Sequence, residues 1–235
     1  MYMKGKPVKF GYKLWILSFF DGYPFYIIPY QAAQKENGSE DSSERLNKDM
    51  KSKKEKKTLS QTVVENLLSV VEIPAKHKIY MDNFFTSYDL FVSLRVKHFF
   101  ATGTVRENRM AKCPLKSSKT LGKMDRGTSD RKFDTKKEIA AVRWNDNPVV
   151  SLITNFEDTR CFTKVERRMK DGKQKVDVPS CVVSYNKYNG DDLFDNHMET
   201  YFSSIQGKKW YWPLFVNAFE TSLVAAWKLP KFFAP

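Results

Sequence analysis

The sequence predicts a mixed α/β fold with a partly parallel sheet. Hydrophobic residues make up 41% of the 235-residue chain and aromatic residues 14%, which is enough apolar material for a core. Between residues 58 and 105, two segments with helical periodicity alternate with two segments rich in branched and aromatic residues. Strands separated by a helix usually pair in parallel within one sheet. This middle region therefore favours an α/β arrangement.

The first elements that we expect are two strands joined by a tight turn. Residues 9–20 and 23–31 are rich in aromatic and branched residues, and only Asp21 and Gly22 separate them. Asp-Gly between two apolar runs is typical of a β-hairpin turn. Residues 34–57 are mostly charged and small, which predicts an exposed, charged insert or linker before the next element.

Two amphipathic helices and two strands follow. Residues 58–71 have apolar positions on one helical face, and Thr58 or Ser60 can serve as the N-cap. Residues 87–97 form a second predicted helix with Ser87 as its N-cap. We expect strands on either side of this second helix, at 77–84 and 99–105.

The sequence from residue 106 onward predicts a β-rich region and a long terminal helix. Residues 106–135 are polar and basic, and strand patterns follow at 138–146, 149–156 and 182–188. Residues 208–229 carry apolar side chains at spacings of three and four, which predicts a long buried helix.

Charge and cysteine content narrow the classes of partner. Lys and Arg number 40 against 27 Asp and Glu, and the net charge of +13 favours a polyanion such as nucleic acid, although a solvated basic surface is the alternative. The three cysteines are far apart and form no CxxC pair, so we expect no zinc. No apolar signal segment and no run of 18 apolar residues is present, so we expect no membrane contact.

Aspartates after predicted strands are candidate metal ligands. Asp21 and Asp82 each follow an apolar strand, and Asp191, Asp192 and Asp195 lie just before a helical pattern. Mg²⁺ prefers hard oxygen ligands such as carboxylates. Aspartate is also a common turn and cap residue, so the residues alone leave both interpretations open.

Several motifs together resemble one known family. MDNFFTS at 81–87, YNKYNGDD at 185–192 and KKWYWPLF at 208–215 occur in the order and approximate spacing of piggyBac-type transposases. The resemblance covers nearly the whole chain. It implies a ribonuclease-H-like transposase core with a β-rich insertion. The core would comprise 1–103, containing the charged insert 34–57, and 179–235, with the insertion at 104–178.

The resemblance also implies a catalytic site. Such cores bind two Mg²⁺ through an aspartate triad and cleave and transfer DNA strands at TTAA sites. Asp82 matches the second aspartate, Asp192 the third, and Asp195 an auxiliary one. The first position falls near Phe19. Either a short deletion brings Asp21 into that position, or the ligand is lost and Asp21 is a turn residue.

The expected function follows from the resemblance and the charge. Arg106, Arg109, Lys112, Lys208 and Lys209 are the candidate DNA contacts, with low sequence specificity because phosphate contacts dominate. We interpret the chain as a transposase-derived, nuclear DNA-binding protein, a truncated or domesticated remnant. An active Mg²⁺-dependent strand transferase and a non-catalytic chromatin interaction protein remain alternatives, and so does a homodimer.

Overall fold

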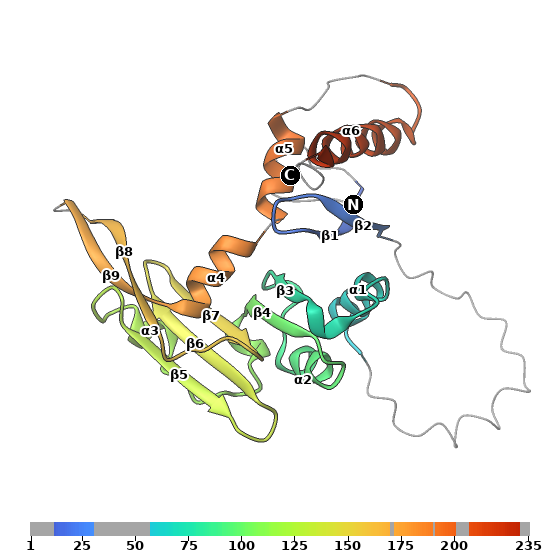
Figure 1. Cartoon of the computed structure of the whole chain (residues 1–235). Helices are drawn as coiled ribbons and strands as arrows, with labels where there is room; N and C mark the ends of the chain where they lie inside the picture. The colour runs from blue at the N-terminus through green and yellow to red at the C-terminus, as the bar shows by residue number, and fades with distance from the viewer. Residues whose placement is uncertain (1–11, 31–56, 170–171, 190, 201–206, 231–235) are drawn as a thin grey trace, which may run out of the picture.

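The computed structural model describes residues 12–30, 57–169, 172–189, 191–200 and 207–230 (Figure 1). In this part of the chain, a five-stranded mixed sheet is accompanied by two separate two-stranded sheets and by helices. The five strands lie in the order β3-β4-β7-β6-β5. They are β3 (Lys78–Met81), β4 (Phe100–Thr104), β5 (Ser129–Asp134), β6 (Ile139–Asn145) and β7 (Val149–Thr154). The predicted α/β class is confirmed.

A parallel strand pair joined by a helix forms one end of this sheet. β3 and β4 pair in parallel, with Met81 beside Gly103, and α2 (Tyr88–Val96) connects them. The predicted N-cap is present, because the Ser87 hydroxyl accepts a hydrogen bond from the Leu90 N–H at 3.3 Å. Since both strands run the same way, their carboxyl ends lie at one edge of the sheet.

An antiparallel meander forms the rest of the sheet. β5 pairs with β6 and β6 with β7, and β7 then pairs antiparallel with β4. The sheet therefore joins strands from both sides of residue 104. Two short 3-10 turns and a short helix lie outside this sheet, at Pro74–Lys76, Glu107–Arg109 and Ser118–Leu121 (α3).

The predicted N-terminal hairpin and first helix are present. β1 (Leu14–Ser18) pairs antiparallel with β2 (Pro24–Pro29), and α1 (Leu59–Leu68) begins after a Thr58 capping box. Trp15 of β1 packs against Val63 and Leu67 of α1. The predicted insert at 34–57 lies outside the described residues except for its last one, Lys57.

The C-terminal third contains a β-ribbon and three helices. β8 (Phe162–Met169) and β9 (Gly172–Pro179) pair only with each other within the described residues and project away from α2 (Figure 1). α4 (Ser180–Tyr188), α5 (Asp191–Thr200) and α6 (Trp212–Lys228) follow.

Two expectations for this region were wrong. Residues 182–188 are helical, because Cys181, Val182 and Tyr185 lie at helical spacing and are buried against Trp144 and Val178. α6 forms where predicted, but it is not buried on all sides. The side chains of its outward face are about half exposed: Phe215, Phe219, Leu223 and Trp227.

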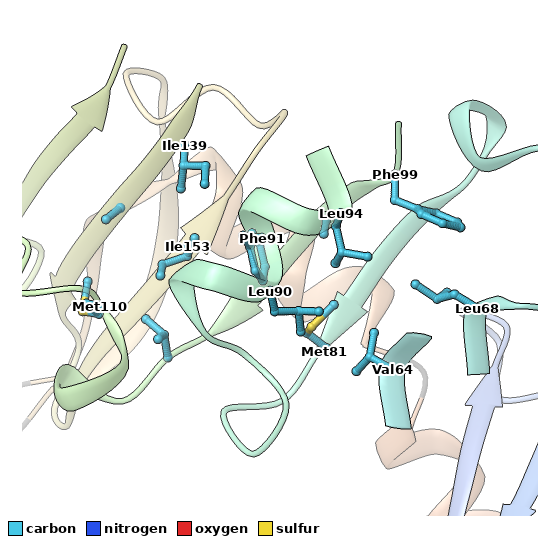
Figure 2. Packing of buried hydrophobic residues seen from close by; sticks show 13 residues of the cluster. Val64, Leu68, Met81, Leu90, Phe91, Leu94, Phe99, Met110, Ile139 and Ile153 are labelled. Carbon is cyan, nitrogen blue, oxygen red and sulfur yellow. The ribbon is translucent and has the colours of Figure 1, made fainter. Parts of the chain in front are cut away.

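The main core lies between α1, α2 and the five-stranded sheet. Leu90, Phe91 and Leu94 of α2 are fully buried, and Figure 2 shows them packed between Met81 and Ile153 of the sheet and Val64 of α1. Burial of such side chains stabilises the fold by roughly 1.5–3 kcal/mol each. No helix in the described ranges is long and apolar enough to cross a membrane.

Candidate functional site

Asp82 follows β3 directly and begins a tight turn at the sheet edge. The backbone carbonyl of Asp82 accepts hydrogen bonds from the N–H groups of Phe85 and Thr86, at 3.1 and 3.2 Å, and from the Thr86 hydroxyl at 3.0 Å. Thr86 is fully buried, whereas Asp82 is exposed. The turn is thus fixed by its backbone, and the carboxylate is presented to solvent.

The neighbouring strand β4 lies very close to this turn, and a glycine makes the close contact possible. A Cβ atom at Gly103 would lie 2.3 Å from Thr86 Oγ1 and 2.9 Å from the Met81 carbonyl oxygen, so only glycine fits there without a shift. The next residue, Thr104, donates its hydroxyl hydrogen to Asp82 Oδ1 at 3.4 Å. The Asn83 N–H donates to the same oxygen at 2.5 Å. Both contacts orient the carboxylate.

Two of the predicted DNA-contacting arginines lie beside Asp82. Arg106 Nε donates to Asn83 Oδ1 at 3.1 Å. Arg109 Nη1 donates to the carbonyl oxygens of Phe84, at 2.5 Å, and Asn83, at 3.5 Å. Arg106 is exposed and Arg109 is half-buried. The two guanidinium groups therefore bond to Asn83 and Phe84, the two residues that follow Asp82 in the turn.

Asp82 and Asp195 line one cavity of about 670 Å³. Its walls come from β1, the ends of β3 and β4, the start of β7, α4 and α5. The polar residues on these walls are Asp82, Asn83, Thr104, Ser151, Asn189 and Asp195, and the apolar ones include Trp15 and Phe194. The Asp82 turn and α5, which carries Asp195, therefore meet at this cavity.

Asp21 and Phe19 do not line this cavity. The Asp21 carboxylate accepts a hydrogen bond from the Tyr23 N–H at 3.0 Å within the β1–β2 turn, and its backbone carbonyl accepts one from Lys228 Nζ. Phe19 lines a separate cavity of about 630 Å³ and makes an edge-on contact with Phe25, at 5.3 Å between ring centroids. The turn nevertheless lies against α5, because Gly22 adjoins Leu193 and Phe194.

The other predicted site residues are spread along the chain. Asp192 lies in the first turn of α5, and its side chain is outside the described set. Lys112 is exposed, with a backbone φ of 56°. Lys208 and Lys209 are exposed just before α6. Their roles stay predictions.

Thr104, Ser151 and Asn189 are cavity residues that the sequence reasoning missed. Thr104 could have been found, because it is the last residue of β4 while Asp82 directly follows β3, and parallel strands end at the same edge. Ser151 and Asn189 gave no comparable signal. Their proximity to Asp82 depends on the pairing of β4 with β7 and on α4 being a helix.

The cavity offers the oxygen ligands that Mg²⁺ prefers. Carboxylate oxygens of Asp82 and Asp195 would hold such an ion, with amide and hydroxyl oxygens nearby. Among the described side chains, no group of three or more His, Cys, Asp and Glu is arranged to hold a metal ion.

The sequence places the chain among the transposases. It belongs to the family described as Transposase IS4, whose sequence model matches residues 1–227. Within that family it is of the piggyBac type. It is 32% identical over 234 residues to human PiggyBac transposable element-derived protein 3 and 34% identical over 237 residues to human PiggyBac transposable element-derived protein 2.

These alignments cover most of this chain and a minority of the relatives. They include 98% and 97% of the chain, but 37% of each human protein. The fold is similar to a cryo-EM structure of the piggyBac transposase synaptic complex with hairpin DNA, with a TM-score of 0.68 and 20% identity. That match covers 100% of this chain and 45% of the transposase chain.

Proposed function

We propose that this chain is a transposase-derived DNA-binding protein, a domesticated remnant that contacts DNA at the Asp82 edge without two-metal strand transfer. The observation that carries the proposal is the placement of Arg106 and Arg109 around the exposed Asp82 turn. Guanidinium groups bind phosphate oxygens well, and the net charge of +13 favours the same partner. The similar transposase structure contains hairpin DNA, which supports this choice of polyanion.

The parallel strands β3 and β4 are, in this proposal, part of a ribonuclease-H-like core. The parallel β3–β4 pair with its crossover helix places Asp82 at the carboxyl edge of the sheet, which is where α/β proteins commonly bind ligands. DNA binding also implies a nuclear location.

The geometry around Phe19 supports the loss of catalysis. Phe19 stands where the resemblance puts the first aspartate, and its ring lines the other cavity. Asp21 uses its carboxylate within its own turn. A two-metal site needs carboxylates that bridge and flank both ions, and Phe19 supplies no oxygen.

An active strand transferase is the second candidate. Asp82 and Asp195 share one cavity, and Mg²⁺ bound there would polarise a phosphodiester oxygen. Thr104 and Asn83 would orient Asp82 in that reaction. Asp192 would have to complete the ligand set.

Binding of fluorescent duplex DNA at increasing salt tests the leading proposal. The dissociation constant should rise steeply with salt and differ little between sequences, because phosphate contacts release counterions. Lys112→Gln should reduce the slope of log K against log salt by about 1. Lys137→Gln, at the β5–β6 turn, is the matched control and should leave the slope unchanged. A shallow slope for the unmodified protein would favour the chromatin interaction protein instead.

Nicking assays separate the binding protein from the enzyme. The purified chain is incubated with Mg²⁺ or Mn²⁺ and a TTAA-bearing duplex, with Asp82→Ala as the control. We expect equal, background nicking by both proteins. Metal-dependent nicking that both Asp82→Ala and Asp192→Ala abolish would establish the strand transferase.

A further inference from the structure

The β8–β9 ribbon has two faces of different character. Cross-strand partners in an antiparallel pair share a face, so the register assigns each side chain to one side. Val165, Val176 and Val178 lie on the inner face and pack with Trp144 of the sheet. The outer face consists of exposed charged side chains: Lys164, Glu166 and Arg168 on β8, and Lys173, Lys175 and Asp177 on β9.

Two of the three charged pairs on the outer face are complementary. Lys164 lies opposite Asp177, and Glu166 lies opposite Lys175. Opposite charges in such positions stabilise a ribbon modestly. The third pair, Arg168 opposite Lys173, joins two cations near the end of the ribbon. Like charges directly opposite each other destabilise the pairing. Among the described residues, neither cation has a carboxylate directly across from it.

We propose that the paired cations Arg168 and Lys173 form a phosphate-binding tip with which the β8–β9 ribbon grips the DNA backbone. A phosphate between the two side chains would convert their repulsion into two charge-assisted contacts. The end of the ribbon extends beyond the five-stranded sheet (Figure 1), and the side chains of Arg168 and Lys173 are exposed. A two-stranded ribbon also fits the width of the DNA major groove. This inference rests on the proposed DNA binding and adds a second contact surface to the Asp82 edge.

Contacts on the inner face attach the ribbon to the rest of the molecule close to the Arg168–Lys173 pair. Arg167, between the tip and the valines, forms an ion pair with Asp146 at 3.4 Å and lies 5.9 Å from the Trp144 ring. Arg126 donates from Nη1 to the backbone carbonyl of Arg168 at 3.0 Å. The ribbon next to the cation pair is thus bonded to residues that flank β5 and β6 of the sheet.

Two Lys→Gln variants on β9, one at each of two neighbouring outer-face positions, test the proposal. Lys173→Gln removes a repulsive partner, so the melting temperature of the free protein should rise by about 1–3 °C. Lys175→Gln removes the partner of Glu166, so its melting temperature should fall or stay level. Lys173→Gln should also weaken duplex binding about three- to tenfold at moderate salt and reduce the salt slope by about 1. Arg168→Gln should act in the same way.

The outcomes separate this inference from the proposed function. If the unmodified chain binds duplex DNA with a steep salt slope while Lys173→Gln and Arg168→Gln bind equally well, the tip is not a phosphate site and DNA binding stands. If the unmodified chain binds no DNA even at low salt, the proposed function fails and the tip loses its partner. A lower melting temperature for both Lys173→Gln and Lys175→Gln would overturn the repulsion on which the tip is argued.

Discussion

Gly22 lies directly against the backbone of Phe194, so the β1–β2 turn is packed onto the first turns of α5. A Cβ atom at Gly22 would be 3.0 Å from the Phe194 nitrogen and 3.2 Å from the Leu193 Cβ. Lys228 of α6 also donates to the Asp21 carbonyl oxygen in this turn. The turn that carries Asp21 and the helix that carries Asp195 are therefore fixed relative to each other.

This contact can be tested with two glycines that share a left-handed backbone. Gly22 has φ +82° and is crowded, whereas Gly172 has φ +115° and no atom within 4 Å of the position that a Cβ atom would take. Gly172→Ala should cost about 1–2 kcal/mol from backbone strain alone. Gly22→Ala should cost at least about 1 kcal/mol more, because the methyl group also meets α5. Urea unfolding measures both, and equal losses would show that α5 yields freely.

The capping box of α1 predicts a second, smaller effect. The Thr58 hydroxyl accepts from the Gln61 N–H at 3.4 Å, and the Gln61 side chain accepts from the Thr58 N–H at 2.9 Å. Thr58→Ala should lower the free energy of unfolding by about 1 kcal/mol. Thr62→Ala, in the interior of the same helix, should be neutral or slightly stabilising because alanine favours helix. Similar losses in the two variants would mean that the cap contributes nothing specific.

The Tyr88–Asp134 hydrogen bond predicts a pH dependence. The Tyr88 hydroxyl donates to Asp134 Oδ2 at 2.5 Å. This bond, helped by the N–H groups of Lys136 and Lys137, holds the pKa of Asp134 below its ordinary value of 3.8. The same bond, together with burial, raises the pKa of Tyr88 from 10.0 to about 12.

The directions of these two pKa shifts set the pH range in which the Tyr88–Asp134 hydrogen bond stabilises the fold. Because the pKa of Asp134 is lowered on folding, its contribution is complete above about pH 3.8 and is lost as the pH falls through the folded value. Because the pKa of Tyr88 is raised, its contribution is complete below about pH 10 and is lost as the pH rises through about 12. Tyr88→Phe should therefore lower stability by a constant amount between these limits. Tyr26→Phe, an exposed control, should not, and a Tyr88→Phe deficit unchanged at pH 2–3 would contradict the linkage.

Among these variants, we expect replacement of Arg143 to cause the largest loss in the free energy of unfolding. It is 1% exposed in β6, and its guanidinium donates to Ser151 Oγ at 2.9 Å, Glu107 Oε1 at 3.1 Å and the Lys116 carbonyl oxygen at 2.5 Å. Arg143→Met keeps much of the volume but removes all three of these hydrogen bonds, at a cost of about 2–4 kcal/mol. Arg131→Met, exposed on β5, should change stability by less than about 0.5 kcal/mol. Thermal or urea unfolding measures both changes in stability. A loss for Arg143→Met as small as that for Arg131→Met would rule out a structural role for this network.

Local signals account for most of the correctly predicted elements. α1 and α2 begin directly after Thr58 and Ser87, two of the expected N-cap candidates, because a capping side chain and apolar periodicity act within a few residues. The segment 182–188 was assigned wrongly because a short apolar run does not distinguish a strand from a buried helix. Its helix is selected by packing against Trp144 and Val178, which the local pattern does not contain.

Only the part of the site that depends on the sequence of a single strand could be predicted. Asp82 stood out because a carboxylate follows an apolar strand, and its motif matched a known one. Its neighbours Thr104 and Ser151 come from strands whose order is set by long-range pairing. Arg109 was expected at the DNA, whereas its hydrogen bonds to two turn carbonyls depend on the tertiary arrangement.

The join between β4 and β7 has a consequence for how the chain folds. The β3–α2–β4 unit and the β5–β6–β7 meander each connect neighbours in sequence, whereas Thr102 and Thr154, bonded at 2.8 Å, are 52 residues apart. Closing a loop of that length costs on the order of 3.5 kcal/mol in chain entropy. Both halves can therefore acquire structure rapidly, and their docking is the slow event. Since Asp82 and Ser151 come from opposite halves, the cavity cannot form before that step.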